Sequence, residues 1–184
     1  FKNFIINTKK KTKNSESIKF ISSDIIKSEN YKLKLTKYSY PEFSYYDLVE
    51  KPVGYLEFFD EKIFLISGMG NINYFDINDS KDNEIKLNKI KTNFQNFIND
   101  PLFFISSSSS IKDIHIDDKY MYISYTKLKS NDCYSMSILR SKININEIKF
   151  EDFYNNNDCI NSDSYANLLV TGGRIISYND HLLF

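Results

Sequence analysis

The sequence predicts an all-β fold. Its 184 residues include 15 Phe and 14 Tyr, which together with abundant Ile favour strands. Short apolar stretches alternate with short polar ones along most of the chain. Because the chain has only 5 Gly and 3 Pro, we expect its many Asn residues to supply the turns. Asn tolerates the left-handed backbone conformation better than most residues do.

Charge and hydropathy limit the classes of partner. The formal net charge is zero, with 24 basic and 24 acidic residues. A nucleic acid or an anionic membrane surface would require a basic excess, so neither is an expected partner. Apolar runs such as residues 63–66 are far shorter than the roughly 18 residues of a membrane-spanning helix, and we expect no membrane insertion. The sequence does not indicate an oligomeric state.

The N-terminal part of the chain gives the weakest pattern. Residues 1–30 form a poorly defined segment, in which Thr8–Ser17 is interpreted as a polar loop. In Tyr31–Tyr38, apolar residues alternate with lysines, which predicts a half-exposed strand. Pro41 then interrupts this pattern.

A strand–turn–strand pattern occurs three times after this point. In each copy a polar turn follows one apolar strand and precedes a more apolar one. The turns align at residues 60–62, 117–119 and 179–181, with offsets of 57 and 62 residues. The copies begin near positions 55, 111 and 174 and read "YLEFFDEKIFLIS" (Tyr55–Ser67), "IKDIHIDDKYMYISY" (Ile111–Tyr125) and "RIISYNDHLLF" (Arg174–Phe184).

The spacing of the copies predicts a β-propeller. A repeat of about 60 residues has room for four short strands, which make one propeller blade. The strands after the first two turns, residues 63–67 and 120–125, are apolar at successive positions, as expected of strands covered on both faces. We therefore expect residues 1–184 to be a single partial domain, about three blades of a longer protein's propeller. The alternative is a chance similarity of hairpins within another all-β fold.

One segment between the first two repeats predicts a helix. Ile90, Phe94, Phe97 and Ile98 follow helical spacing, so we expect a short amphipathic helix near 87–99.

The two cysteines are expected to form a disulfide. The midpoint of Cys133 and Cys159 is position 146, inside an expected turn at residues 144–147. In an antiparallel hairpin around that turn the two thiols would face each other. A disulfide implies an oxidising compartment, so we expect a periplasmic or extracellular protein. The alternative is two unrelated thiols in a cytosolic protein.

No residue pattern marks a metal site or a catalytic motif. His115 and His181 have no further ligands at metal-binding spacing, and both are interpreted as structural or solvated. Turn formation explains the acidic residues 113, 117 and 118 better than a calcium site does, since calcium takes six or more oxygens. Catalytic residues therefore stay unknown.

Gly172, Gly173 and Arg174 are the candidate cofactor- or substrate-binding residues. Paired glycines before a strand indicate a close approach of the backbone or an unusual turn. An arginine at the start of the strand can present a planar set of donors to carboxylates or carbonyls. The alternative is a surface loop followed by a surface arginine.

The stretch "GGRIISYNDHLLF", following "IKDIHIDDKYMYISYTKL", resembles the glucose/sorbosone dehydrogenase family. Members of that family are six-bladed β-propellers that use pyrroloquinoline quinone (PQQ) with calcium to oxidise aldose sugars, usually outside the cytoplasm. The resemblance covers about Tyr55–Phe184. It implies hydride transfer from C1 of an aldose to the quinone, with a cofactor or substrate contact for Arg174. The main cofactor ligands of the family fall outside this chain.

The chain departs from the family at one position that matters for catalysis. The family's basic histidine precedes the Gly-Arg motif by three residues, and Val170 stands there in this sequence. Valine cannot accept a proton from a sugar hydroxyl. Two functions are therefore expected as alternatives, a PQQ-dependent sugar dehydrogenase-like propeller that lacks its base, and a non-catalytic propeller that binds or interacts.

Overall fold

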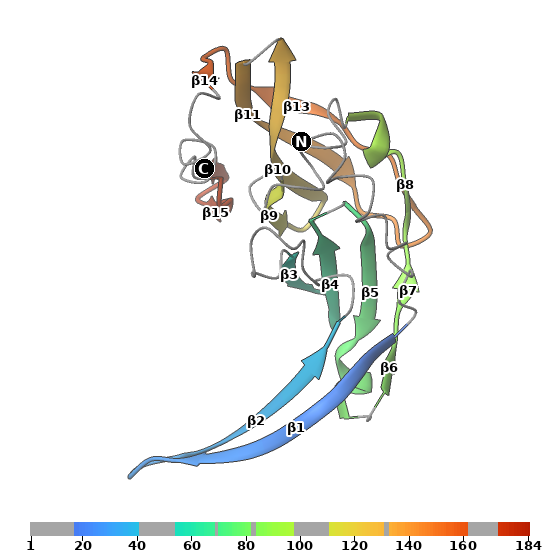
Figure 1. Ribbon diagram of the computed structural model, residues 1–184, viewed down its shortest axis with the longest axis vertical. Helices are drawn as coiled ribbons and strands as arrows, with labels where there is room; N and C mark the ends of the chain where they lie inside the picture. Colours follow the sequence, from blue (N-terminus) through green and yellow to red (C-terminus); the bar gives the residue numbers. More distant parts are fainter. Residues whose placement is uncertain are drawn as a thin grey trace, which may run out of the picture.

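The computed structural model describes residues 17–40, 54–68, 70–81, 84–97, 111–130, 133–161 and 173–184. Strands dominate the described residues, and several separate antiparallel sheets form without closing on themselves (Figure 1). The predicted all-β class is thus confirmed. No helix among the described residues is long and apolar enough to cross a membrane.

The first repeat folds into a four-stranded antiparallel sheet. Its strands follow one another in chain order: β3 (Gly54–Phe59), β4 (Lys62–Ser67), β5 (Ile72–Asp76) and β7 (Asn88–Lys89). A short 3-10 helix, η3 (Ile77–Lys81), follows β5. In β4 the successive residues Phe64, Leu65 and Ile66 are all buried, because other elements cover both faces of the strand. This confirms the expectation drawn from its continuous apolar run.

The second repeat folds in the same way. The sheet has the order β13 (Glu151–Asn155), β11 (Cys133–Lys142), β10 (Tyr120–Ser130) and β9 (Ile111–Ile116), and β14 (Ile160–Asn161) also pairs with β11. Met121 and Ile123 face the first sheet, whereas Tyr122 packs on the opposite side. The central strand is again covered on both faces.

The third repeat contributes a hairpin of β15 (Ile176–Tyr178) and β16 (His181–Leu183). Strand pairing shows which positions of the three repeats are equivalent. Glu57 pairs with Phe64, His115 with Tyr122 and Ile176 with Leu183. The repeats are therefore offset by 58 and then 61 residues, so the predicted offsets of 57 and 62 place the second turn one residue too early.

Local turn chemistry explains this shift. In the first and third hairpins both loop residues have positive φ, 47° and 58° at Asp60 and Glu61, and 45° and 60° at Asn179 and Asp180. Such angles suit tight two-residue hairpins. In the second hairpin, Asp117 follows the end of β9 and donates its backbone N–H to Tyr120 O at 3.0 Å. Its Oδ1 accepts hydrogen bonds from the backbone N–H groups of residues 119 and 120, at 2.8 and 2.7 Å.

The two large sheets pack face to face around one core. Phe64, Ile66 and Ile72 from the first sheet meet Ile111, Met121 and Leu139 from the second. A parallel pairing of β8 (Lys91–Thr92) with β12 (Glu147–Ile148) also links the two repeats.

The segment near 87–99, where a short amphipathic helix was expected, forms two short strands and one short 3-10 helix instead. The described part of this segment contains β7, β8 and only one short 3-10 helix, η4 (Phe94–Phe97), while Ile98 lies outside the described residues. Ile90 donates its backbone N–H to Ile72 O at 3.0 Å, and Phe94 is fully buried against Gly70. The periodic apolar residues therefore anchor an extended segment in the core. The backbone of this segment pairs with other strands and is not available for a helix.

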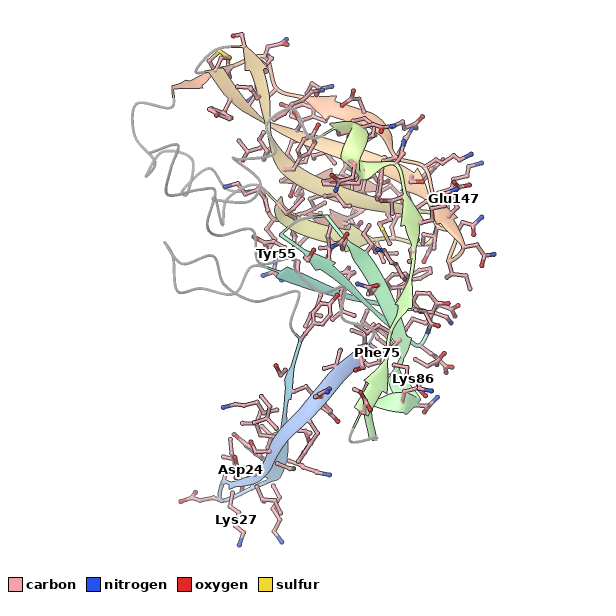
Figure 2. The ribbon with its side chains drawn as sticks, turned by 45° about the vertical axis from the view of Figure 1, so that its right-hand side comes forward. Asp24, Lys27, Tyr55, Phe75, Lys86 and Glu147 are labelled. Carbon is pink, nitrogen blue, oxygen red and sulfur yellow. A yellow bond between two sulfur atoms is a disulfide. The ribbon has the colours of Figure 1, made fainter. Side chains whose placement is uncertain are left out.

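The N-terminal segment contains a strand that the sequence did not predict. β1 (Ser17–Lys27) pairs with the expected strand β2 (Lys32–Ser39), and the hairpin projects from the body of the molecule, with Asp24 and Lys27 near its far end (Figure 2). Its base pairs with β6 (Glu84–Lys86) and covers the outer face of the first sheet. Residues 8–16 and Pro41 lie outside the described residues.

Cys133 and Cys159 form the predicted disulfide, with their Cα atoms 5.1 Å apart. The expected register is present locally, since Ser137 pairs with Asn155, and 137 and 155 have the same midpoint, 146, as the two cysteines. The register then shifts, and Cys133 pairs through its backbone with Asn161. The disulfide thus joins the start of β11 to the segment just before β14.

Candidate functional site

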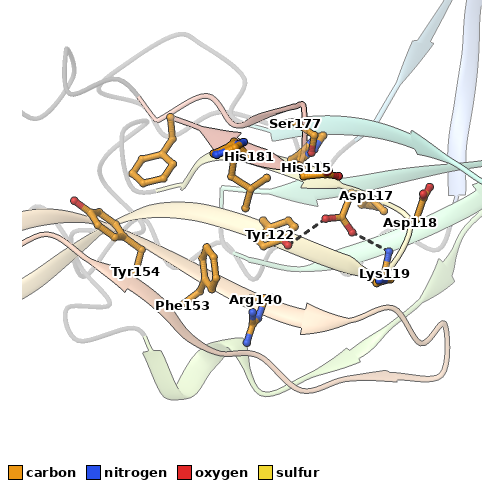
Figure 3. A pocket seen from close by; sticks show the side chains of 14 residues that line it. His115, Asp117, Asp118, Lys119, Tyr122, Arg140, Phe153, Tyr154, Ser177 and His181 are labelled. Atoms are coloured by element: carbon orange, nitrogen blue, oxygen red, sulfur yellow. Dashed lines mark hydrogen bonds between the residues drawn. The ribbon is translucent and has the colours of Figure 1, made fainter.

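Three polar side chains, one from each repeat, form a hydrogen-bonded chain. Glu57 lies on β3, His115 on β9 and Ser177 on β15, which are the first strands of the three repeats. The Nδ1 atom of His115 lies 3.1 Å from Glu57 Oε1, and its Nε2 atom lies 2.7 Å from Ser177 Oγ. Figure 3 shows His115 and Ser177 side by side. The imidazole therefore connects a carboxylate to a hydroxyl.

The packing of the first strands positions this chain. Tyr55 OH on β3 donates to Ile111 O on β9 at 2.9 Å. Ile175, just before β15, donates its N–H to Asp113 Oδ2 at 2.8 Å. Glu57 Oε1 also accepts the backbone N–H of Ile116 at 3.3 Å. Each of the three strands is thus held to its neighbour close to the imidazole.

A stacked aromatic ring supports the imidazole from β10. The rings of His115 and Tyr122 lie 6.3 Å apart with an interplanar angle of 20°. Tyr122 OH donates to Asp117 Oδ2 at 3.1 Å (Figure 3). Burial, followed by the neighbouring Asp117 carboxylate, raises the pKa of Tyr122 to about 12. For Asp117, burial acts to raise the pKa, but hydrogen bonds from two backbone N–H groups and from Tyr122 outweigh it and lower the pKa.

His115 and Ser177 open into a groove of about 870 Å³. The groove lies between the second sheet and the β15–β16 hairpin, and its polar lining includes Asp117 and His181. Aromatic rings line its other part, and Phe153, Tyr154 and Phe184 are 40%, 36% and 48% exposed. A concave surface that combines exposed rings with a few polar groups is typical of small-molecule sites.

Arg140, which also lines the groove, contacts one ring of the aromatic wall. The guanidinium of Arg140 lies 4.8 Å from the ring centroids of both Tyr120 and Phe153. Arg140 also donates to Glu151 Oε1 at 2.7 Å. Cation–π contacts at exposed sites contribute about 0.5–1 kcal/mol, so Arg140 favours the observed position of the Phe153 ring.

Gly173 and Arg174, two of the candidate residues predicted from the sequence, do not line this groove. Gly173 is buried with φ of 124°, a side chain there would meet Lys112, and its carbonyl accepts a hydrogen bond from Ser124. Arg174 is exposed, and its charge opposes the pKa rise that burial produces at Asp113. Arg174 is not among the residues that line the groove. Gly172 and Val170 lie outside the described residues.

The sequence alone did not predict the hydrogen-bond partners of His115. Neither Glu57 nor Ser177 is close to His115 in sequence, with separations of 58 and 62 residues. The repeat offset was the available signal, because an offset of 58 makes Glu57 and His115 equivalent positions of adjacent first strands. His181 is exposed and bonds to Asn179 O of its own turn at 2.6 Å, as expected of a solvated side chain.

The described residues do not fit a calcium site. Within these residues no group of three or more His, Cys, Asp and Glu side chains could hold a metal ion. Arg174, to which the family resemblance gives a cofactor or substrate contact, lines neither this groove nor the smaller pocket at residues 120–151. No catalytic step through PQQ and calcium can be derived from this part of the chain.

Comparison of the chain with protein-family models, curated proteins and solved structures gives no match.

Proposed function

We propose that this protein is a β-propeller module that binds a small saccharide in the groove between its second sheet and the β15–β16 hairpin. The propeller part of the proposal is supported by the way the repeats follow one another. A four-stranded and a five-stranded antiparallel sheet pack face to face, and each contains four strands in chain order. The hairpin of the third repeat begins next to the first strand of the second sheet. Successive propeller blades repeat four-stranded sheets in this manner.

The groove carries the binding part of the proposal. A pyranose ring has an apolar face of C–H groups and an edge of hydroxyls. The exposed rings of Phe153, Tyr154 and Phe184 suit the apolar face. Asp117 and His181 line the same groove and can exchange hydrogen bonds with hydroxyls. This combination of exposed rings and polar groups is the single observation on which the saccharide proposal rests.

The resemblance to sugar dehydrogenases supports the same ligand class but a different activity. Oxidation in that family needs a base where this chain has Val170. We therefore favour binding over PQQ-dependent oxidation. A periplasmic or extracellular location accords with the Cys133–Cys159 disulfide, because such bonds persist in oxidising compartments.

Saturation-transfer NMR against a panel of neutral monosaccharides and disaccharides tests the proposal. The method suits a protein that contains no Trp and so lacks a strong fluorescent reporter. We expect ring-proton saturation of at least one sugar, and a clear loss in Phe153→Ala. Phe58→Ala is the matched control, since Phe58 is also an exposed phenylalanine, 59% accessible, but does not line the groove. An equal loss in both variants, or no saturation of any sugar by the folded protein, would refute saccharide binding in this groove.

A further inference from the structure

We propose that Ser177 is an activated nucleophile for carboxylic esters, with His115 as its general base and Glu57 as the residue that orients the base. Nucleophilic serines require a base within hydrogen-bond reach and a third group that holds the base. The structure has this sequence of contacts, with Ser177 Oγ 2.7 Å from His115 Nε2 and Glu57 Oε1 3.1 Å from Nδ1. The inference uses the groove of the proposed function for access but does not depend on its preference for sugars.

The position of Glu57 fixes the tautomer of the imidazole. A carboxylate only accepts hydrogen bonds when ionised, so Nδ1 of His115 carries the proton that points to Glu57. The lone pair of Nε2 then faces Ser177, whose Oγ–H donates to it. When His115 takes up the proton of Ser177, the charge of Glu57 stabilises the imidazolium. A hydroxyl in this setting is more nucleophilic than an ordinary surface serine.

The site is also pre-arranged and partly open. The side chains of His115 and Glu57 are only 16% and 25% exposed, so packing against neighbouring strands restricts their rotation. Ser177 itself lies on an exposed strand and lines the groove. A substrate can therefore reach Oγ while the base behind it stays fixed, which is the arrangement that efficient catalysis requires.

Three other serines of the described residues donate to oxygen acceptors instead of an imidazole. Ser124 Oγ donates to the carbonyl of Gly173, Ser17 Oγ donates to Glu84, and Ser141 Oγ donates to Lys142 O. None of these acceptors can carry a proton away and return it near neutral pH as an imidazole does. Ser177 differs from these three serines because its hydrogen-bond partner is an imidazole nitrogen.

The reaction balances without any further reagent. Ser177 Oγ forms a bond to the ester carbonyl carbon while its proton moves to His115 Nε2. The bond from that carbon to the alcohol oxygen then breaks, and the leaving alcohol takes the proton from Nε2. Water next attacks the acyl group on Ser177, giving up one proton through His115 to Oγ. The products are the alcohol and the carboxylic acid, and Ser177 is regenerated.

Labelling with a fluorophosphonate probe tests the inference on the protein in its oxidised form. The phosphorus of the probe is attacked by an activated serine with loss of fluoride, and mass spectrometry locates the adduct. We expect the adduct on Ser177 and hydrolysis of 4-nitrophenyl acetate by the same protein. Both His115→Gln and Glu57→Gln should slow labelling and ester hydrolysis. The loss in His115→Gln should be about 10²–10⁴-fold, which is the usual contribution of a general base. Ser23→Ala is the control, because Ser23 is an exposed serine on the projecting hairpin.

Two outcomes would overturn the inference. The first is a folded, disulfide-bonded protein with no adduct on Ser177. The second is an adduct whose rate of formation is unchanged in His115→Gln, because a purely structural role for the three side chains would alter stability but not reactivity. Saccharide binding is measured on the same samples. Labelling without saccharide binding refutes only the proposed function, and saccharide binding without labelling refutes only this inference.

Discussion

Removing the Cys133–Cys159 disulfide should cost a predictable amount of stability. The bond closes a loop with a sequence separation of 26 residues. On the chain-entropy relation, a cross-link that closes a loop of that length lowers the conformational entropy of the unfolded chain. This stabilises the folded protein by about 3.5 kcal/mol at 25 °C. For a protein of 150–250 residues, each kcal/mol shifts the melting temperature by about 2–4 °C, so the Cys133→Ser/Cys159→Ser variant should melt about 7–14 °C lower.

Thermal unfolding followed by far-ultraviolet circular dichroism measures this difference. The parent protein should lose the same increment when a reductant is added, because reduction opens the same loop. The double variant supplies the matched control, since the reductant should leave its melting temperature unchanged. If the double variant melts within 1 °C of the oxidised parent, the bond does not restrain the unfolded chain, and the reasoning from loop length is wrong.

Three further predictions concern the core and the groove. Gly70→Ala should lower the free energy of unfolding by about 1–3 kcal/mol in urea titrations, because its φ is 79° and a methyl group would overlap the Phe94 ring; a loss under 0.5 kcal/mol would show that the ring yields freely. Asp117→Asn should lower the Tyr122 pKa from about 12 in a spectrophotometric titration, since the Asp117 carboxylate helps to raise it, and an unchanged pKa would assign the shift to burial alone. Burial lowers the Lys112 pKa from 10.5 to about 8, so above pH 8 the unfolded chain binds a proton that the folded protein has lost. The free energy of unfolding should therefore rise with pH from about 8 until tyrosines ionise near 10. Denaturant unfolding at several pH values should show no such rise in Lys112→Met, and a rise that persists in this variant contradicts the assignment.

Features of the fold that depend on local pattern could be predicted from the sequence. The central strands β4 and β10 are apolar at successive positions, and burial of both faces follows directly from that. The disulfide was predictable because Cys133 and Cys159 are symmetric about a polar turn, even though the register shifts near the bond. β1 could not be predicted from its sequence, "SIKFISSDIIK", because most of the strand is exposed and its apolar residues do not alternate.

Features that depend on packing between repeats could not be predicted. Ile90 and Phe94 have helical spacing, but each side chain packs separately into the core that the two sheets form together. The candidate site has the same origin, because Glu57 and Ser177 meet His115 only once three strands lie side by side. The capping of the second turn by Asp117 shifted the alignment of the repeats by one residue and concealed the equivalence of positions 57 and 115.

The chain of contacts through His115 has a consequence for how many repeats the protein needs. Each repeat supplies one member, Glu57 from the first, His115 from the second and Ser177 from the third. A single repeat holds no pair, and two adjacent repeats hold one contact. All three repeats are therefore needed for the complete chain of contacts from the carboxylate to the hydroxyl. Deleting the second hairpin should remove both contacts, whereas deleting the first or the third should leave one of them.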